Sequence, residues 1–281
     1  MASTLESSMS IPATESAWDC HAHVFGPYEH YPLAANRTYT PPEALVQQYL
    51  GLLDQMGIAH GVLVHPSAYG NDYQLLFETL RNNDRLRGVI VANAENALNF
   101  MALREKGIRA ARFSHRSGAN TNFVGSASMY DFESLKSTLA NANLHAEVWT
   151  DCVALQDIDK ILVSSPVPIV IDHMGGFDPQ KGINDPGFQK LLRLLDTGHV
   201  WIKLCVYRNL LNEPDWEIGK PFMEAMIKQN PDRLVWGSDW PHLRVVPTPN
   251  TPDLLNLLKQ WAHDELAVQK ILTTNPAGLY N

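Results

Sequence analysis

The sequence predicts a single α/β domain folded as a (β/α)8 barrel, the TIM-barrel architecture, and three observations support this prediction. Short runs of β-branched residues alternate with longer stretches of helical periodicity, a pattern typical of repeated strand and helix units around a parallel sheet. Eight such runs can be counted, the number that closes this barrel. The chain has 281 residues, 45% of them hydrophobic, which suits one large domain better than two.

The predicted strands are rich in Val, Ile and aromatic residues. They span 18–24, 60–65, 87–93, 108–114, 144–150, 168–173, 200–206 and 233–238. Between the first two, Thr40, Pro41 and Glu43 form the pattern of a capping box, which predicts a helix from about 41 to 57. Thr251 before Pro252 repeats this signal and predicts a helix that covers the barrel near its eighth strand.

Composition limits the classes of binding partner and the cellular compartment that we expect for this protein. The formal charge of −8 arises from mixed acids and bases with no basic stripe, so we expect neither nucleic acid nor a membrane surface as a partner, but a small molecule. Cys20, Cys152 and Cys205 are too scattered for a disulfide framework or a thiolate zinc site. No targeting or spanning segment stands out. We expect a loose tail over 1–16, one domain over 17–281, and a cytoplasmic protein that is a monomer or a homo-oligomer.

Polar residues gather at the carboxyl ends of the predicted strands, where barrel enzymes carry their active sites. They are His21, His23, His65, Ser67, Arg112, His115, Asp172, His173, Arg208, Asp239 and His242. His21 and His23 should project together from one face of their strand, with Cys20 and Ala22 facing away. Two long connections, 25–40 and 114–129, should form the mouth of the site. Each polar residue also has a plain structural reading, as a hydrogen-bonded histidine or a surface arginine.

Taken together, H-x-H after the first strand, D-H after the sixth and G-S-D-W after the eighth resemble the amidohydrolase superfamily. Within it, "DCHAHVFGP", "YPLAANRTYTPP", "GVLVHPSAYG", "IDHMGG" and "GSDWPH" resemble the 2-pyrone-4,6-dicarboxylate lactonase-like branch, which includes sulfomuconolactone hydrolase-like enzymes. The resemblance extends from Trp18 to the C-terminal "TNPAGLY". It implies a lactonase of aromatic compound catabolism, a hydrolase that opens the ring ester of a small anionic lactone.

The resemblance also implies roles for individual residues. Asp239 would activate water, while His21, His23 and His173 would polarise the lactone carbonyl. Substrate binding would fall to Tyr39, Ser67, Arg112, Trp149, Arg208 and His242. Imidazole donors aimed at a developing oxyanion, together with a carboxylate base, are sufficient for this chemistry.

Metal chemistry is the competing interpretation. The superfamily resemblance implies a bridging lysine or glutamate on strand four and a histidine on strand five for two metals. Strand four ends here at Arg112 and strand five at Trp149 and Thr150, so we expect no binuclear site. We favour no cofactor, with one zinc ion held by His21, His23, His173 and Asp239 as the alternative.

Two departures from the branch concern charge. Gly176 stands where the branch has an arginine, and Arg116 occupies a shifted position after the fourth strand. If one anion clamp is missing, a monoanionic lactone is the expected substrate. The alternatives are a sugar-acid lactone isomerase, a mononuclear-zinc amidohydrolase or decarboxylase, and a ligand-binding barrel without activity. Serine-hydrolase and nucleotide-binding motifs are absent from the sequence.

Overall fold

The computed structural model describes residues 16–118, 123–211, 213 and 215–281. In these ranges eight parallel strands form one sheet in the order β1 to β8, as predicted. The strands are β1 (Trp18–Ala22), β2 (His60–Val64), β3 (Leu86–Val91), β4 (Ile108–His115), β5 (His145–Thr150), β6 (Ile169–Ile171), β7 (Val200–Leu204) and β8 (Leu234–Trp236). Of the predicted tail, 1–15 lies outside the described residues.

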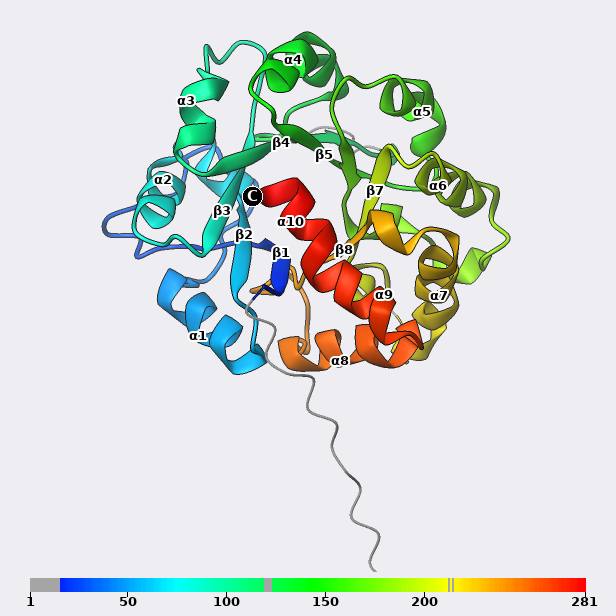
Figure 1. Cartoon of the computed structure of the whole chain (residues 1–281). Coiled ribbons are helices and arrows are strands. Elements are labelled where there is room, and N and C mark those ends of the chain that lie inside the picture. Colours follow the sequence, from blue (N-terminus) through cyan, green and yellow to red (C-terminus); the bar gives the residue numbers. More distant parts are fainter. Residues whose placement is uncertain (1–15, 119–122, 212, 214) are drawn as a thin grey trace, which may run out of the picture.

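Helices surround the strands (Figure 1). They are α1 (Val46–Met56), α2 (Gln74–Arg81), α3 (Phe100–Glu105), α4 (Met129–Asn141), α5 (Leu155–Val163), α6 (Pro186–Asp196), α7 (Lys220–Gln229), α8 (Thr251–Ala262), α9 (Glu265–Gln269) and α10 (Asn275–Tyr280). In Figure 1, α10 lies across one end of the barrel, beside the C-terminus. None of the helices in the described part of the chain has the length and apolarity needed to cross a bilayer.

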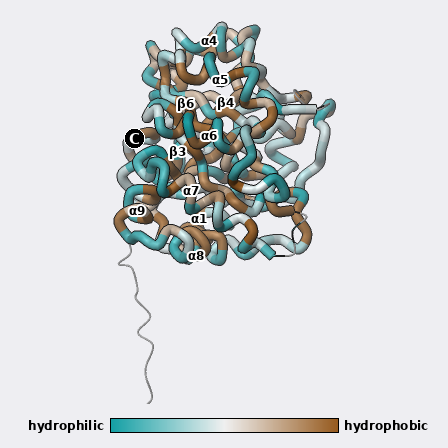
Figure 2. The backbone as a smooth tube through the Cα atoms, turned by 90° about the vertical axis from the view of Figure 1, so that its right-hand side faces the viewer, coloured by the Kyte–Doolittle hydropathy of each residue, from teal (hydrophilic) through white to brown (hydrophobic). Residues whose placement is uncertain are grey.

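The hydrophobic core has two parts. A small cluster inside the barrel includes Trp18, Val62 and Val235 and is closed off by Tyr280 of α10. A larger cluster fills the space between the strands and the surrounding helices. Figure 2 shows the consequence along the backbone, where hydrophobic and hydrophilic stretches alternate through the outer helices. This two-part core is what the period-2 and period-3.6 patterns of the sequence require.

Strand β1 is irregular just before the predicted histidine pair. Its pairing register with β2 shifts between Asp19 and Ala22, as at a β-bulge. Cys20 consequently packs in the cluster inside the barrel, which corrects the expectation that it faces away from the interior. His21 is nevertheless buried at the same end of the barrel as His23.

The barrel closes between β1 and β8 mainly beyond the end of β8. The amide of Asp239 donates to the carbonyl of His21, and the amide of His23 donates to the carbonyl of Trp240, both at 2.8 Å. The buried Asp19 carboxylate accepts from the amide of Ser238 at 2.8 Å and from its hydroxyl at 2.6 Å. Gly237 is required here, because a Cβ at this position would lie 2.7 Å from the Cβ of His21.

Two predicted helix starts are wrong. Helix α1 begins at Val46 instead of 41, with Leu45 as its N-cap. Its predicted cap partner Glu43 instead accepts a hydrogen bond from the amide of Tyr28 at 2.6 Å. Helix α8 begins at Thr251, the residue predicted as its cap, and Asn250 stands at the N-cap position without a side-chain cap hydrogen bond. In both cases the side chain that matched the helix signal makes a contact with a distant segment, which local patterns do not encode.

Asp19→Ala should destabilise the protein by about 3 kcal/mol or more, because it leaves several buried donors without an acceptor. Besides Ser238, the carboxylate accepts from Tyr49 Oη at 3.1 Å and from the amide of His21 at 3.2 Å. Urea unfolding measures the change. Asp54→Ala removes a surface pair with Arg85 and should change the free energy of unfolding by about 1 kcal/mol or less. Equal effects of the two variants would contradict the role of Asp19.

Candidate active site

A cavity of about 380 Å³ opens at the carboxyl ends of the strands, a size suited to a small molecule. Its walls include residues of both predicted mouth loops, among them Thr38, Ser126 and Ala127. All the predicted site residues line the cavity except His21 and His242. Those in the lining are His23, Tyr39, Ser67, Arg112, Trp149, His173, Arg208 and Asp239.

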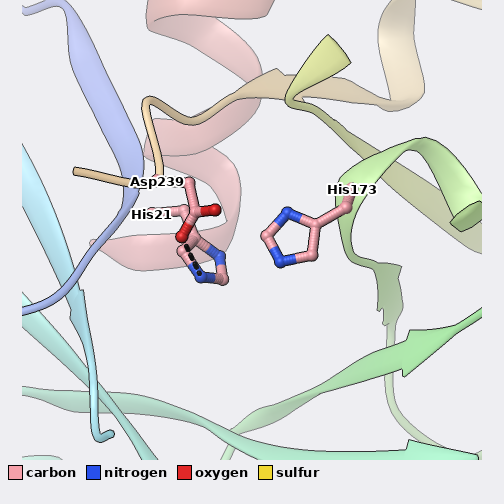
Figure 3. A group of neighbouring side chains, drawn as sticks. All are labelled: His21, His173 and Asp239. Atoms are coloured by element: carbon pink, nitrogen blue, oxygen red, sulfur yellow. Dashed lines mark ion pairs between the residues drawn. The ribbon is translucent and has the colours of Figure 1, made fainter. Parts of the chain in front are cut away.

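A cluster of three histidines and one carboxylate lies at the bottom of the cavity, where His23, His173 and Asp239 line the cavity and His21 is fully buried behind them. Asp239 Oδ1 lies 3.5 Å from His23 Nε2 and 3.7 Å from His21 Nε2, and the two imidazole nitrogens are 3.3 Å apart. The ring of His173 lies across from His21 and Asp239 (Figure 3), and its centroid is 4.8 Å from that of His21. Asp239 and His173 both have positive φ angles, 56° and 49°, a backbone strain that is common at functional sites.

Asp239 is held as a carboxylate by its neighbours. Arg208 Nε donates to Oδ2 at 2.7 Å, Nη2 of the same guanidinium also contacts Oδ2, and the Tyr207 hydroxyl donates at 3.0 Å. Burial opposes ionisation of Asp239, but Arg208, together with the neighbouring histidines, outweighs burial and holds the pKa of the carboxyl well below its ordinary value. Because Oδ2 is occupied, Oδ1 is the oxygen that faces the histidines.

Burial keeps two of these histidines, His21 and His173, neutral at physiological pH. Burial lowers the pKa of His21 to about 4, and the nearby Lys203 ammonium adds to this effect. Burial also lowers the pKa of His173 well below its ordinary range. A neutral imidazole has one donor and one acceptor nitrogen, so the tautomer decides what each ring can do.

A buried ion cluster that the sequence analysis missed lies beneath the floor. Lys203 Nζ on β7 lies 2.7 Å from Glu147 Oε2 on β5, 3.0 Å from Asp172 Oδ1 and 3.1 Å from His21 Nδ1. Arg112 Nε donates to the other oxygen of Asp172 at 2.7 Å. The lysine and both carboxylates are fully buried, and such charges persist in an interior only when paired. The sequence signal that could have revealed this cluster is a lysine in the middle of an apolar strand.

The donor set does not fit a zinc ion bound to His21. His21, His173 and Asp239 do place ligand atoms within 4.8 Å of one another, and the buried Nδ1 of His173 has no hydrogen-bond partner among the described residues. A ligating histidine, however, normally donates its second nitrogen's proton to a carboxylate or carbonyl. The second nitrogen of His21 faces the ammonium of Lys203 at 3.1 Å. Lys203 Nζ also fills a second potential ligand group, formed by His21, Glu147 and Asp172.

The cavity carries more positive charge than the sequence predicts. Besides Arg112 and Arg208, it is lined by Arg116 and Arg244. The guanidinium of Arg116 lies 4.6 Å from the Trp149 ring, and that of Arg244 lies 4.7 Å from the Tyr39 ring. Arg116, which the resemblance placed at a shifted position after the fourth strand, lies in the cavity wall. Within the described ranges neither Arg116 nor Arg244 forms an ion pair with an acidic side chain.

The backbone at Gly176 leaves no room for the arginine that the resemblance implies at this position. Its φ angle is 54°, and a Cβ there would lie 2.9 Å from the Cβ of Asp151 and 3.0 Å from the carbonyl oxygen of Thr150. Any side chain would therefore force the backbone to move. Two arginines instead reach the cavity from other loops, Arg116 after β4 and Arg244 after β8.

Two other histidines differ in their relation to the cavity. His242 Nδ1 contacts the hydroxyl of Tyr207 at 3.1 Å, and Nε2 contacts that of Thr251 at 2.7 Å. Both nitrogens are thus engaged with protein outside the cavity wall, which differs from the predicted substrate contact. His65 lines the cavity, but its Nε2 donates to the carbonyl of Gly70 at 2.8 Å. It has the structural role that is usual for a buried histidine.

The barrel, the histidines at its strand ends and the aspartate after β8 define an enzyme of the amidohydrolase class. The family model described as Amidohydrolase matches residues 18–281, and the chain belongs to this family. The match confirms the predicted resemblance and covers the whole predicted domain except its first residue.

Individual relatives are similar over nearly their whole length. The chain is 34% identical to the 4-sulfomuconolactone hydrolase of Rhizobium radiobacter, over 97% of this chain and 92% of that protein. It is 26% identical to the D-galactarolactone isomerase of Agrobacterium fabrum, over 94% and 90%. A solved structure from Acinetobacter baumannii, described as a probable 2-pyrone-4,6-dicarboxylic acid hydrolase with citric acid bound, is 30% identical. It superposes with a TM-score of 0.82 over 94% of this chain and 99% of the other.

Stability should fall as the pH decreases from about 6.5 to 4, because burial lowers the pKa of His21, His65 and His242 from 6.5 to about 4. In this window the unfolded chain binds more protons at these sites than the native chain, each contributing a slope of about 1.4 kcal/mol per pH unit. Asp19 opposes the trend, since burial raises its pKa from 3.8 to about 6, but three sites outweigh one. The melting temperature measured across this range should therefore decrease.

A matched pair of variants separates these buried sites from the rest of the protein. His65→Asn should reduce the slope of melting temperature against pH. His263→Asn replaces an exposed histidine that contacts Glu224 and should leave the slope unchanged. A melting temperature that stays constant or rises on acidification would contradict the neutral state of the buried histidines.

Proposed function

We propose that the protein is a lactonase that opens the ring ester of a small anionic lactone with water. The carrying observation is the cavity floor, where Asp239 Oδ1 lies within 3.7 Å of two histidine nitrogens beneath a wall that contains four arginines. The similarity to a 4-sulfomuconolactone hydrolase over nearly the whole chain supports the same reaction class. We place this reaction in aromatic compound catabolism.

The reaction assigned to the floor needs no bound metal. Imidazole N–H groups hydrogen-bond the lactone carbonyl oxygen and stabilise the negative charge that develops there. Asp239 orients a water molecule and accepts its proton as the water oxygen bonds to the carbonyl carbon. The ring C–O bond then breaks, the departing oxygen takes up that proton, and the new carboxylic acid ionises. One proton per turnover is released to the solution.

The low pKa of Asp239 makes it a weak base, and Arg208 is responsible. All three nitrogens of this guanidinium contact protein groups, because Nη1 donates to the carbonyl of Leu243 at 2.9 Å while Nε and Nη2 contact Asp239. We therefore assign Arg208 first to the orientation of Asp239. If an anionic substrate draws Arg208 away from Asp239, the basicity of the carboxylate rises as the site fills.

Arg116 and Arg244 are the arginines we assign to the anionic groups of the substrate. They reach the cavity from different loops, and neither shares its charge with an acidic side chain within the described ranges. Aromatic rings hold both guanidinium groups in place. Two such groups match two anionic substituents, so the expectation of a monoanionic lactone loses its physical basis. We propose a ring that carries two anionic groups, of the carboxylate or sulfonate type.

An isomerase is the second candidate, because one relative is named D-galactarolactone isomerase. An isomerase would use the same carboxylate to move a proton within the substrate without consuming water. The two reactions differ in one observable, since only hydrolysis produces a new acid.

Titration at constant pH should record sustained uptake of base when the enzyme meets 4-sulfomuconolactone or 2-pyrone-4,6-dicarboxylate. Asp239→Asn should reduce the turnover by about 1,000-fold or more, because the amide cannot accept the water proton. Its fold is checked by circular dichroism. Substrate conversion without base uptake would assign the isomerase, and near-normal turnover of Asp239→Asn would exclude the aspartate as the base.

Arg116→Met and Arg244→Met should each raise the KM for a dianionic lactone by about 10-fold or more, and should raise the KM of a monoanionic analogue less. The reason is that each variant leaves one substrate anion without its partner. Arg193→Met, on the exposed surface of α6, is the matched control and should change neither value. Equal effects on both substrates would contradict a separate contact for each anion.

A further inference from the structure

We propose that Lys203 is a positioning residue that fixes His21 and His23 in opposite tautomers, so that His21 donates a hydrogen bond to the substrate carbonyl and His23 accepts one. This inference refines the proposed lactonase mechanism, since it separates two histidines to which the sequence assigns the same role. It rests on a chain of four hydrogen-bonding groups, Lys203, His21, His23 and the carbonyl of Val64. The ammonium at one end can only donate, and the carbonyl at the other end can only accept.

The first link is Lys203 to His21. An ammonium group has three hydrogens and no lone pair, so it can only donate. Its three neighbours are Glu147 Oε2 at 2.7 Å, Asp172 Oδ1 at 3.0 Å and His21 Nδ1 at 3.1 Å. The ammonium thus hydrogen-bonds Glu147 Oε2 and His21 Nδ1 and forms an ion pair with Asp172 Oδ1, which has no hydrogen-bond partner among the described residues. A hydrogen on His21 Nδ1 would instead point at the ammonium.

Asp172 is the competing partner of this nitrogen, because its Oδ1 lies 3.5 Å from His21 Nδ1. That contact is longer than the contact with Lys203, and the same oxygen already faces the ammonium at 3.0 Å. We therefore take Lys203, not Asp172, as the hydrogen-bond partner of His21 Nδ1. With Nδ1 as the acceptor, neutral His21 carries its hydrogen on Nε2, the nitrogen that faces Asp239 Oδ1 at 3.7 Å.

The last link is His23 to the backbone. His23 Nδ1 lies 2.7 Å from the carbonyl oxygen of Val64, and a carbonyl can only accept. His23 therefore carries a hydrogen on Nδ1, which leaves its Nε2 to accept the Nε2 hydrogen of His21. The contact of 3.3 Å between the two Nε2 atoms is then a hydrogen bond from His21 to His23. Every link of the chain points in the same direction, from Lys203 to Val64.

The two histidines consequently differ in what they offer a substrate. The Nε2 hydrogen of His21 can turn from His23 to a lactone carbonyl, where it stabilises the developing charge. Once released, His23 Nε2 presents a lone pair 3.5 Å from Asp239 Oδ1, where it can accept a hydrogen bond from the water that Asp239 orients. With this arrangement His23 does not donate to the carbonyl, because its Nδ1 hydrogen is bound to Val64.

Nitrogen-15 NMR of protein labelled at histidine tests the assignment directly and needs no substrate. At neutral pH, His21 should show a protonated Nε2 and a bare Nδ1, and His23 the reverse. His21→Gln and His23→Gln identify the two sets of signals by their loss. A proton on Nδ1 of His21 would overturn the role of Lys203, and a protonated Nε2 on His23 would overturn its role as an acceptor.

Kinetics of a charge-balanced variant test the consequence. Lys203→Met combined with Glu147→Gln removes one buried charge of each sign, so that His21 can place its hydrogen on Nδ1 toward Asp172. The kcat for the lactone should fall about 100-fold with a small change in KM, as for loss of one oxyanion donor. Glu147→Gln alone, which retains the ammonium, should keep kcat within about 3-fold; this limit follows from the unchanged donor.

The NMR experiment and the kinetic experiment can contradict the proposal independently of each other. A double variant with unchanged kcat would overturn the link between the tautomer and catalysis. If the double variant does not fold, the spectrum of the unaltered protein still decides the tautomers. If the unaltered protein hydrolyses no lactone, the proposed function fails, while the spectrum continues to test the chain from Lys203 to Val64.

Discussion

The contact of one buried ammonium group with three acceptors determines much of this barrel's interior. Lys203 neutralises Glu147 and Asp172 and occupies one nitrogen of His21, so a charge in the protein interior is connected to the cavity floor. An unpaired ion at this depth would be costly, and a paired one is tolerated only in a defined geometry. The opposite nitrogen of His21 faces His23 and Asp239, which do line the cavity. The buried charges of the core are therefore in direct contact with a residue of the site.

The cavity combines two kinds of arginine. Arg208 and Arg112 have their charge engaged by Asp239 and Asp172, so they orient carboxylates and set their ionisation. Arg116 and Arg244 lie against aromatic rings and keep their charge for a ligand. The distinction matters because a guanidinium already paired with a carboxylate contributes little net attraction to an incoming anion. Counting arginines in the wall would overstate the charge that a substrate meets.

The sequence predicted the strands and most of the cavity wall because both follow from local rules. Residues at the carboxyl ends of consecutive parallel strands must meet at one mouth, so His23, His173 and Asp239 could be placed without coordinates. Lys203 was missed because attention to strand ends passes over a charge inside a strand, where a lysine resembles a surface residue with a buried stem. Arg244 was missed because its reach depends on the conformation of the loop after β8, which no periodicity encodes.

The backbone contacts that join β1 to the segment after β8 determine when the site is assembled during folding. His21 and Asp239 come from opposite ends of the chain, and the backbone bond between them is one of the bonds that close the barrel. A chain that has formed every earlier strand still lacks its aspartate beside its histidines until the last strand docks on the first. Under the proposed mechanism, partially folded forms of the protein have no activity, and turnover begins only when the ring of strands is complete.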